Sequence, residues 1–241
     1  DIIENNRFDA RAVFGLYPAQ RTGADTVSVF DEAGQTVTHT FEHLRQQSDK
    51  VTGKPNLSLA DFISTSKDNT DYLGGFTVSI FGAEELANEY KAKGDDYSAI
   101  LIQSLADRFA EAFAEHLHER IRKEFWGYKA DETLGNEELI KEKYVGIRPA
   151  PGYPACPEHS EKAVLFDWLG SEEKIGTKLT EHFAMMPPSS VSGFYYSHPE
   201  SEYFNVGKIS QDQLEDYAKR KGWSLDVAKR WLAPNLDDSI V

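Results

Sequence analysis

The sequence contains little cysteine and no long apolar run. Of its 241 residues only Cys156 is a cysteine, which excludes an intrachain disulfide framework and a cysteine-rich zinc site. We therefore expect a reducing, cytoplasmic environment. No apolar stretch approaches the ~20 residues that a membrane span needs, so we expect no membrane insertion. Lys and Arg total 26 against 40 Asp and Glu, and this net charge of −14 argues against nucleic-acid binding.

Several catalytic signatures are also absent. The chain has no P-loop, no GxGxxG, no G-x-S-x-G and no Cys/His catalytic pattern. His116 and His118 are two residues apart on a predicted helix and point in different directions, so they cannot chelate one metal ion. We predict neither a catalytic residue nor a metal site. No segment resembles a linker, so we expect one domain over residues 1–241. The chain starts at aspartate rather than Met, and we expect that its N-terminal part has been removed.

Hydrophobic patterning predicts an α+β fold with helices against a mostly antiparallel sheet. A hairpin is expected where residues 26–30 and 36–41 flank a Gly-containing loop. The other expected strands cover 12–17, ending at Pro18, then 72–81, 191–198 and 203–209. The expected helices cover 95–126, 136–143, 157–169, 211–221 and 225–232.

The predicted helix over 95–126 is the clearest element. Apolar residues recur every four positions along it, and we expect this stripe to face the sheet: Tyr97, Leu101, Leu105, Phe109, Phe113, Leu117, Ile121 and Phe125. Asp107, Glu111 and His118 align on another face. Such a face could meet a cation, a polar ligand or a partner's histidine; the alternative is an ordinary solvated face of an acidic protein.

The stretch 148–157 is the most informative, because four prolines in ten residues favour a stiff, extended conformation that cannot pair into a sheet. Gly152 permits a close approach of backbone to a ligand. Arg148 offers a planar fork for a carboxylate, and Tyr153 adds a flat ring. Together they predict a rigid cradle for a small molecule with a carboxylate and an aromatic ring; a merely structural connection is the alternative.

A second aromatic group lies in residues 191–198. On a strand, Gly193 and Tyr195 share one face and Phe194 and Tyr196 the other. A glycine beside a tyrosine leaves room for a flat ligand ring. Core packing of these aromatic side chains is the alternative.

With these motifs the sequence resembles the activation domain of cobalamin-dependent methionine synthase. Four stretches of sequence carry the resemblance: Arg148-Pro-Ala-Pro-Gly-Tyr-Pro-Ala-Cys-Pro157, the predicted helix around residues 105–120, residues 191–199, and the C-terminal residues around 230–236. It implies a single curved α+β domain with a twisted, mostly antiparallel sheet, a long central helix and flanking helices.

The resemblance also implies a function. The family's domain binds S-adenosylmethionine and caps the cobalamin domain while inactive cob(II)alamin is reductively methylated to methylcobalamin. The electron comes from a flavodoxin or a flavodoxin-like reductase. The chain would thus be a domain of a methyltransferase of methionine biosynthesis, 5-methyltetrahydrofolate–homocysteine methyltransferase, and is not expected to be catalytic alone. Cobalamin would be held by another domain, since no Asp-x-His-x-x-Gly motif occurs here.

Site residues follow from the resemblance by position. Arg148 matches the arginine that holds the S-adenosylmethionine carboxylate, and Ala150, Gly152 and Tyr153 match the loop that lines the ligand. The other expected ligand contacts are the late-strand pair Tyr195 and Tyr196 and the acidic Glu111 and Glu142, while Asp107 and His159 are expected at the contact with the cobalamin partner and the edge of the site.

One difference from the family pattern and one cluster of basic residues bear on the function. The family domain begins upstream of this chain with a segment that supplies a ligand-binding aspartate, so we weigh a non-catalytic docking domain for a corrinoid protein or reductase as an alternative. A free-standing activation protein for another corrinoid enzyme is a second one. Basic residues around Lys219–Lys221 and Lys229–Arg230 predict a docking patch for an acidic electron donor; ordinary helix C-terminal cations explain them equally well.

Overall fold

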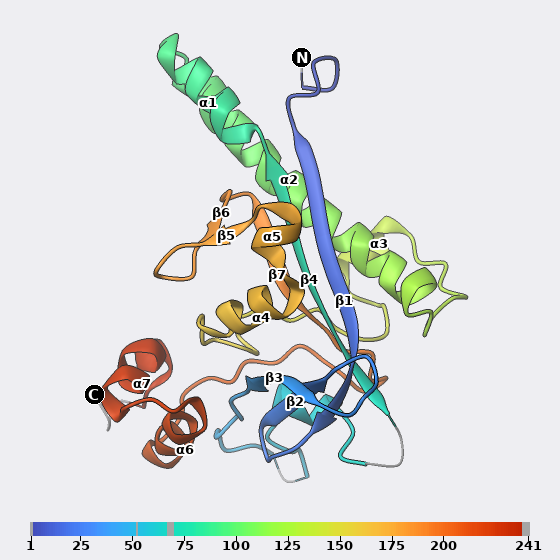
Figure 1. Ribbon diagram of the computed structural model, residues 1–241, viewed down its shortest axis with the longest axis vertical. Helices are drawn as coiled ribbons and strands as arrows, with labels where there is room; N and C mark the ends of the chain where they lie inside the picture. The colour runs from blue at the N-terminus through green and yellow to red at the C-terminus, as the bar shows by residue number, and fades with distance from the viewer. Residues whose placement is uncertain (1, 52, 67–69, 238–241) are drawn as a thin grey trace. The chain divides into compact units, whose positions relative to one another are not determined.

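The structure is a computed structural model that describes residues 2–51, 53–66 and 70–237 (Figure 1). It divides into two compact units. Unit 1 comprises Asp1–Gly15, Gly75–Glu132 and Phe166–Gly193, and unit 2 comprises Leu16–Gly74, Thr133–Leu165 and Phe194–Val241. The boundaries fall inside four regular elements, and each unit is described by itself. The expectation of one domain over 1–241 stays a prediction.

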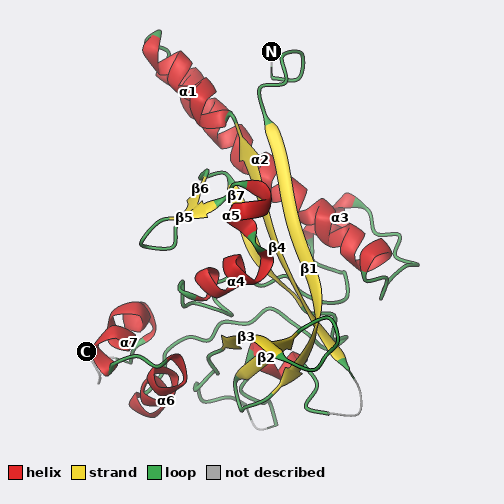
Figure 2. Cartoon of the chain, in the orientation of Figure 1, coloured by secondary structure: helices red, strands yellow, loops and turns green. Residues whose placement is uncertain are grey.

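The main sheet has five strands in the order β3-β2-β1-β4-β7 (Figure 2). The pairs β1–β2 and β2–β3 are antiparallel, which confirms the predicted hairpin. Together with the helices described in the next paragraphs, this sheet confirms the α+β fold class. A second sheet pairs two short antiparallel strands, β5 and β6. The strands are β1 Asp9–Arg21, β2 Thr26–Phe30, β3 Val37–Glu42, β4 Asp71–Phe81, β5 Lys178–Leu179, β6 Met185–Met186 and β7 Ser190–Tyr195.

Two strand predictions were wrong. Pro18 does not end the first strand but lies inside β1, where the pairing with β2 starts one residue later, at Ala19. A proline fits there because its missing N–H is not required by the antiparallel pairs that follow. Residues 203–209 form an irregular segment with one isolated bridge, Ile209 to Leu236, rather than a strand.

A helix is present in each of the five predicted ranges, but α4 begins at 161 rather than 157, and α1 and α5 were not predicted. Asp95 caps the long helix by accepting a hydrogen bond from the Ser98 N–H at 2.9 Å, as its position predicted. The helices are α1 Ala83–Ala92, α2 Asp96–Arg120, α3 Asn136–Ile140, α4 Glu161–Leu169, α5 Ser171–Ile175, α6 Gln211–Lys221 and α7 Leu225–Leu232. A π-turn, Ile121–Phe125, extends α2, and 3-10 turns cover Leu59–Phe62 and Ala233–Asn235.

The buried face of α2 is not the predicted one. Tyr97 is 78% exposed and Phe109 45% exposed, while Ala99, Ala106 and Ala110 are buried against α1 and the end of β4. Small side chains let the two helices pack closely, and only one face of α2 can do so. Tyr97, Leu101, Leu105 and Phe109 therefore lie on its outer side, while Leu117 and Ile121, at the end of the predicted stripe, are buried as expected.

Candidate functional site

The Pro-rich loop is folded into tight turns rather than into an extended segment. The Gly152 N–H donates to the Cys156 carbonyl at 2.7 Å, and the Cys156 N–H donates to the Tyr153 carbonyl at 2.9 Å. Gly152 has φ +95°, a conformation that L side chains rarely adopt. The prediction of polyproline geometry was wrong, because prolines fix φ but leave ψ free to turn at the intervening residues.

The loop is fastened to its neighbours through backbone groups. The Phe194 N–H donates to the Pro149 carbonyl at 2.8 Å, and Val206 N–H donates to the Pro154 carbonyl at 2.9 Å. Ile147 pairs with Tyr196 in an isolated antiparallel bridge. The prolines lack donors, but their carbonyls accept, so the loop is hydrogen-bonded to other segments of unit 2.

Arg148 lies half-buried between two tyrosines. Its Nη1 donates to the Tyr144 hydroxyl at 3.1 Å, and its backbone N–H donates to the Tyr203 hydroxyl at 3.0 Å. The two hydroxyls lie 3.3 Å apart. The Tyr144 contact orients the guanidinium, whose planar fork suits a carboxylate, and the Tyr203 contact holds the backbone.

Tyr203 and Tyr144 were missed by sequence reasoning. Tyr203 was placed on a strand that does not form, and its ring is 38% exposed. Its segment is held from the β3 side, since Gln46 Nε2 donates to the Asn205 carbonyl at 2.7 Å. A signal was present, because Tyr203 follows a polar turn, but its contact with Arg148 depends on the tertiary fold.

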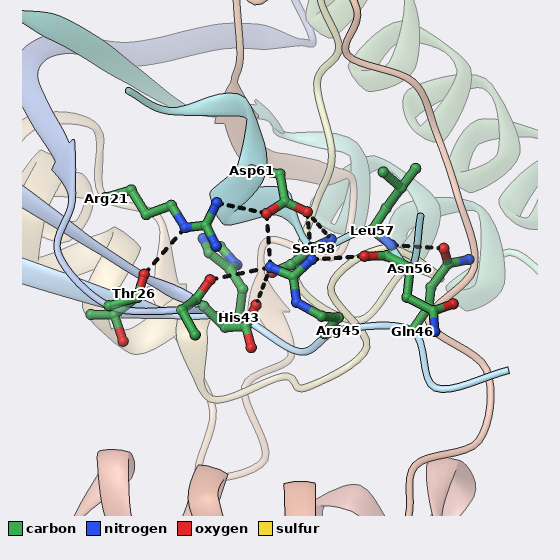
Figure 3. Close-up of polar contacts among 12 residues, drawn as sticks. Arg21, Thr26, His43, Arg45, Gln46, Asn56, Leu57, Ser58 and Asp61 are labelled. Atoms are coloured by element: carbon green, nitrogen blue, oxygen red, sulfur yellow. Dashed lines mark hydrogen bonds and ion pairs between the residues drawn. The ribbon is translucent and has the colours of Figure 1, made fainter. Parts of the chain in front are cut away.

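A cluster of hydrogen bonds and ion pairs holds the segment around Arg45 and Gln46 in place (Figure 3). Arg45 binds both oxygens of Asp61 through its two Nη atoms at 2.6 and 2.7 Å, and Arg21 adds a third contact at 2.8 Å. Gln46 Oε1 also accepts from the Leu57 N–H at 3.1 Å. Burial acts to raise the pKa of Asp61, but the hydrogen bonds from Arg45 and Ser58 outweigh it and lower that pKa.

Gly152 lies directly under an imidazole ring. A Cβ built on Gly152 would be 2.3 Å from His159 Cε1, so only glycine fits. His159 Nδ1 lies 3.1 Å from Lys162 Nζ, and partial burial followed by this cation lowers the pKa of His159. Ala150 is half-buried in the same loop, and Tyr153 is 59% exposed. Ala150, Gly152 and Tyr153 thus lie in one loop with Arg148, and His159 packs on Gly152.

Tyr195 and Tyr196 are placed differently from the expectation. Both side chains are fully buried, and the Tyr196 hydroxyl lies 3.0 Å from His43 Nε2. Burial raises the pKa of Tyr196 well above its usual range and lowers that of His43 to about 3. These side chains are core residues in this structure, since alternation put aromatic rings on both faces of a strand that is buried on both. The expected ligand contact of this pair stays a prediction.

The acidic candidates lie in both units. Glu142 is exposed, with φ 52°, just after α3 in unit 2. Asp107 and Glu111 are exposed on α2 in unit 1. Asp107 Oδ1 accepts from the Ser189 hydroxyl at 2.7 Å and borders a cavity of about 220 Å³. His118 is buried and does not share their exposed face, which corrects the predicted alignment.

The predicted basic patch is smaller than expected. Lys221 is 10% exposed and forms an ion pair with Glu161 at 2.5 Å, and Arg220 pairs with Glu42 at 2.5 Å. Neither points to a docking partner. Lys219 and Arg230 are exposed.

Neither a membrane-crossing helix nor a metal cluster is found in the part of the chain that the structure describes. None of its helices combines the length and apolarity that a bilayer span demands. Among the same residues, no three His, Cys, Asp or Glu side chains lie close enough together to bind a metal ion.

The fold and the loop define an α+β domain that carries a rigid, arginine-bearing loop. The chain belongs to the family described as vitamin B12 dependent methionine synthase, activation domain, whose sequence model matches residues 1–222. A solved structure described as the MetH reactivation domain bound to AdoHcy is similar to this chain, with 51% identity and a TM-score of 0.94. The match covers 98% of this chain and 73% of that one. The resemblance seen in the sequence is thereby confirmed.

Proposed function

We propose that this chain binds S-adenosylmethionine at the Arg148 loop and acts as the reactivation module of a cobalamin-dependent methionine synthase. The observation that carries the proposal is Arg148, oriented by Tyr144 within a loop that only glycine at 152 permits. Family membership and the AdoHcy-bound relative support the ligand class.

The residues fit the ligand's chemistry. A guanidinium fork suits the α-carboxylate, and the exposed rings of Tyr203 and Tyr153 offer apolar faces to an adenine. Glu142 supplies a negative charge that suits a sulfonium. Tyr203 joins the predicted ligand contacts Tyr195 and Tyr196 in this assignment. The side chains bind and orient the ligand, and none is proposed to be catalytic.

The reaction itself would take place with a cobalamin domain of the same enzyme. That domain's cobalamin, once reduced by one electron from a flavodoxin-type donor, would supply the nucleophile that takes the methyl group from the sulfonium, with S-adenosylhomocysteine as the leaving group. Asp107 is proposed as an acceptor for a histidine of the cobalamin partner, with Glu111 beside it on α2. This chain's part is to position the ligand and exclude competing reactants.

A docking role has support of its own from α2. Tyr97, Leu101 and Phe109 are exposed on one helix, and exposed apolar side chains in a group mark interaction surfaces. We propose that the cobalamin domain covers part of this face. If α2 only docked and the loop held no ligand, the chain would bind that domain but not S-adenosylmethionine.

Calorimetric titration with S-adenosylmethionine and S-adenosylhomocysteine tests the proposal. We expect saturable binding that Arg148→Ala weakens at least about tenfold, because a charge-assisted bidentate contact is lost. Arg230→Ala is the matched control, since it removes an exposed arginine of the same unit. Unchanged affinity in Arg148→Ala would contradict the assignment.

A further inference from the structure

The segment after the Pro-rich loop contains two buried carboxylates that the proposed function does not use. Glu158 is 2% exposed and Glu161, the first residue of α4, is 0% exposed. Carboxylates this deeply buried are rare unless the protein compensates them. Their partners therefore show what holds this segment in place.

Both carboxylates are held by the last turns of α6. Lys221 Nζ lies 2.5 Å from Glu161 Oε1 and 4.0 Å from Glu158 Oε2. The Tyr217 hydroxyl donates to Glu158 Oε2 at 3.2 Å. Tyr217 and Lys221 are four residues apart and share one face of α6. One helix face thus anchors the segment at two points.

The contacts of Glu161 only partly compensate for the burial of its carboxylate. Its Oε2 is buried and has no hydrogen-bond partner among the described residues. Burial raises the pKa of Glu161 to about 7, although Lys221 acts to lower it. The side chain therefore exchanges its proton near neutral pH.

The anchored segment leads directly into the ligand loop. His159 lies between the two carboxylates in sequence, and its ring covers Gly152. Glu158 also accepts from the Ser160 N–H at 2.6 Å, which fixes the backbone on the other side of His159. A continuous set of contacts thus runs from α6 through Glu158 and His159 to the loop that begins at Arg148.

We propose that the Glu161–Lys221 ion pair positions the S-adenosylmethionine loop, and that proton uptake by Glu161 loosens the loop and weakens ligand binding. This inference rests on the proposed function of the loop. Both members are positioning residues, since they act through His159 and Gly152 rather than on the ligand. Coupling is reciprocal, so ligand binding must favour release of the same proton.

The direction follows from the contacts. When Glu161 is protonated, Lys221 loses its closest anion and is left with Glu158, whose oxygens already accept from Ser160 and Tyr217. One of two anchors of the segment is then weakened. The loop must be ordered again when the ligand binds, and this entropy cost lowers the affinity.

Other charged or titratable groups surround Glu161. Burial raises the pKa of Cys156, Tyr196 and Tyr217, and lowers that of His43, so these four are neutral near pH 7. His159, whose pKa is lowered, takes up a proton on the acid side and must be separated from Glu161 by experiment. The remaining facing charges are Glu158, Glu42, Lys162, Lys221 and Arg220.

Calorimetry with S-adenosylhomocysteine at pH 6 and pH 8 tests the inference on the whole chain. If binding lowers the pKa of Glu161 by one unit, the affinity of the unmodified protein falls about fivefold at pH 6, and about 0.4 proton is released per ligand at pH 7. Comparing heats in two buffers of different ionisation enthalpy measures the proton. Glu161→Gln, nearly the same shape, should abolish the release, and Lys219→Met should leave it unchanged.

Amide exchange gives a second measurement that needs no variant. At pH 6 the amides of 148–160, corrected for intrinsic rate, should lose protection relative to those of α2. Equal affinity at both pH values, a proton release retained in Glu161→Gln, or unchanged protection would each overturn the inference. A retained pH dependence would assign the effect to His159. Absence of binding at either pH in every variant would instead defeat the proposed function, and the inference with it.

Discussion

Replacing Lys221 by methionine removes the cation that lies 2.5 Å from Glu161, while keeping the length of the side chain. Glu161 is fully buried, so it cannot recover the lost interaction from water. The cost of the change should depend on pH, because a buried carboxylate without a cation takes up a proton instead of remaining ionised.

The sign follows from linkage. Glu161 has a folded pKa of about 7 against an ordinary value of 4.5. Since this pKa is raised, the ionised group destabilises the fold above pH 7, and the penalty fades as the pH falls toward 4.5. Lys221→Met raises the folded pKa further, which extends the penalty to higher pH by about 1.4 kcal/mol for each pH unit above 7.

The expected magnitude can be worked out at two pH values. At pH 8.5 the ionisation part amounts to about 2 kcal/mol and the lost hydrogen bond adds about 1 kcal/mol. At pH 6 only the hydrogen-bond part remains. For a chain of this length the melting temperature should fall by about 6–12 °C at pH 8.5 and by about 2–4 °C at pH 6.

Thermal unfolding followed by circular dichroism at both pH values measures the effect. Lys219→Met on the same helix is the control, because Lys219 is exposed and should change stability by less than about 0.5 kcal/mol. The double variant that also carries Glu161→Gln should regain most of the loss at pH 8.5. A loss of equal size at both pH values would refute the reasoning.

Three further changes test the loop, the α2 interface and the polar cluster. Gly152→Ala should destabilise the protein by about 1–3 kcal/mol and weaken ligand binding, because its methyl group would meet His159 from a strained backbone. Ala106→Leu should cost about 1–3 kcal/mol by overpacking the face of α2 that lies against α1. Asp61→Asn should cost about 2–3 kcal/mol at pH 7, since the charge-assisted bonds from Arg45 are lost.

Urea unfolding measures all three changes, and two of them have a control. Ala112→Leu places the same side chain on the exposed side of α2 and should be nearly neutral; an equal loss there would contradict the assigned buried face. The folded pKa of Asp61 is lowered, so its contribution is present above pH 3.8 and disappears on further acidification. A difference between Asp61→Asn and the unmodified protein that persists at pH 2 would count against that cause. For Gly152→Ala, unchanged binding would show that the loop tolerates a shift of His159.

Much of the secondary structure could be predicted from local patterns. The β2–β3 hairpin follows from two β-rich runs around a Gly-containing loop, and the closing helices α6 and α7 have the predicted bounds. Asp95 caps α2 where its side chain predicted a cap. These features depend on interactions between residues that are close together in the sequence, so local patterns are sufficient to predict them.

Patterns that depend on distant partners were less reliable. The large apolar stripe of α2 predicted its buried face, but along most of the helix the core side is formed by Ala99, Ala106 and Ala110 with Ile102, which pack against α1. The sequence contains α1 as well, yet no local rule states which face of α2 it would cover.

In the candidate site, too, local features could be predicted from the sequence and long-range contacts could not. The sequence alone determined the rigid loop, its arginine and its glycine, since proline content and the φ freedom of glycine are local properties. Only the tertiary structure decided that Tyr203 contacts Arg148 and that Tyr195 and Tyr196 lie in the core. It also turned Lys221 from a surface cation into the partner of a buried carboxylate 60 residues away in the chain. Burial and long-range charge pairing are set by which elements pack together, and no short stretch of sequence contains that information.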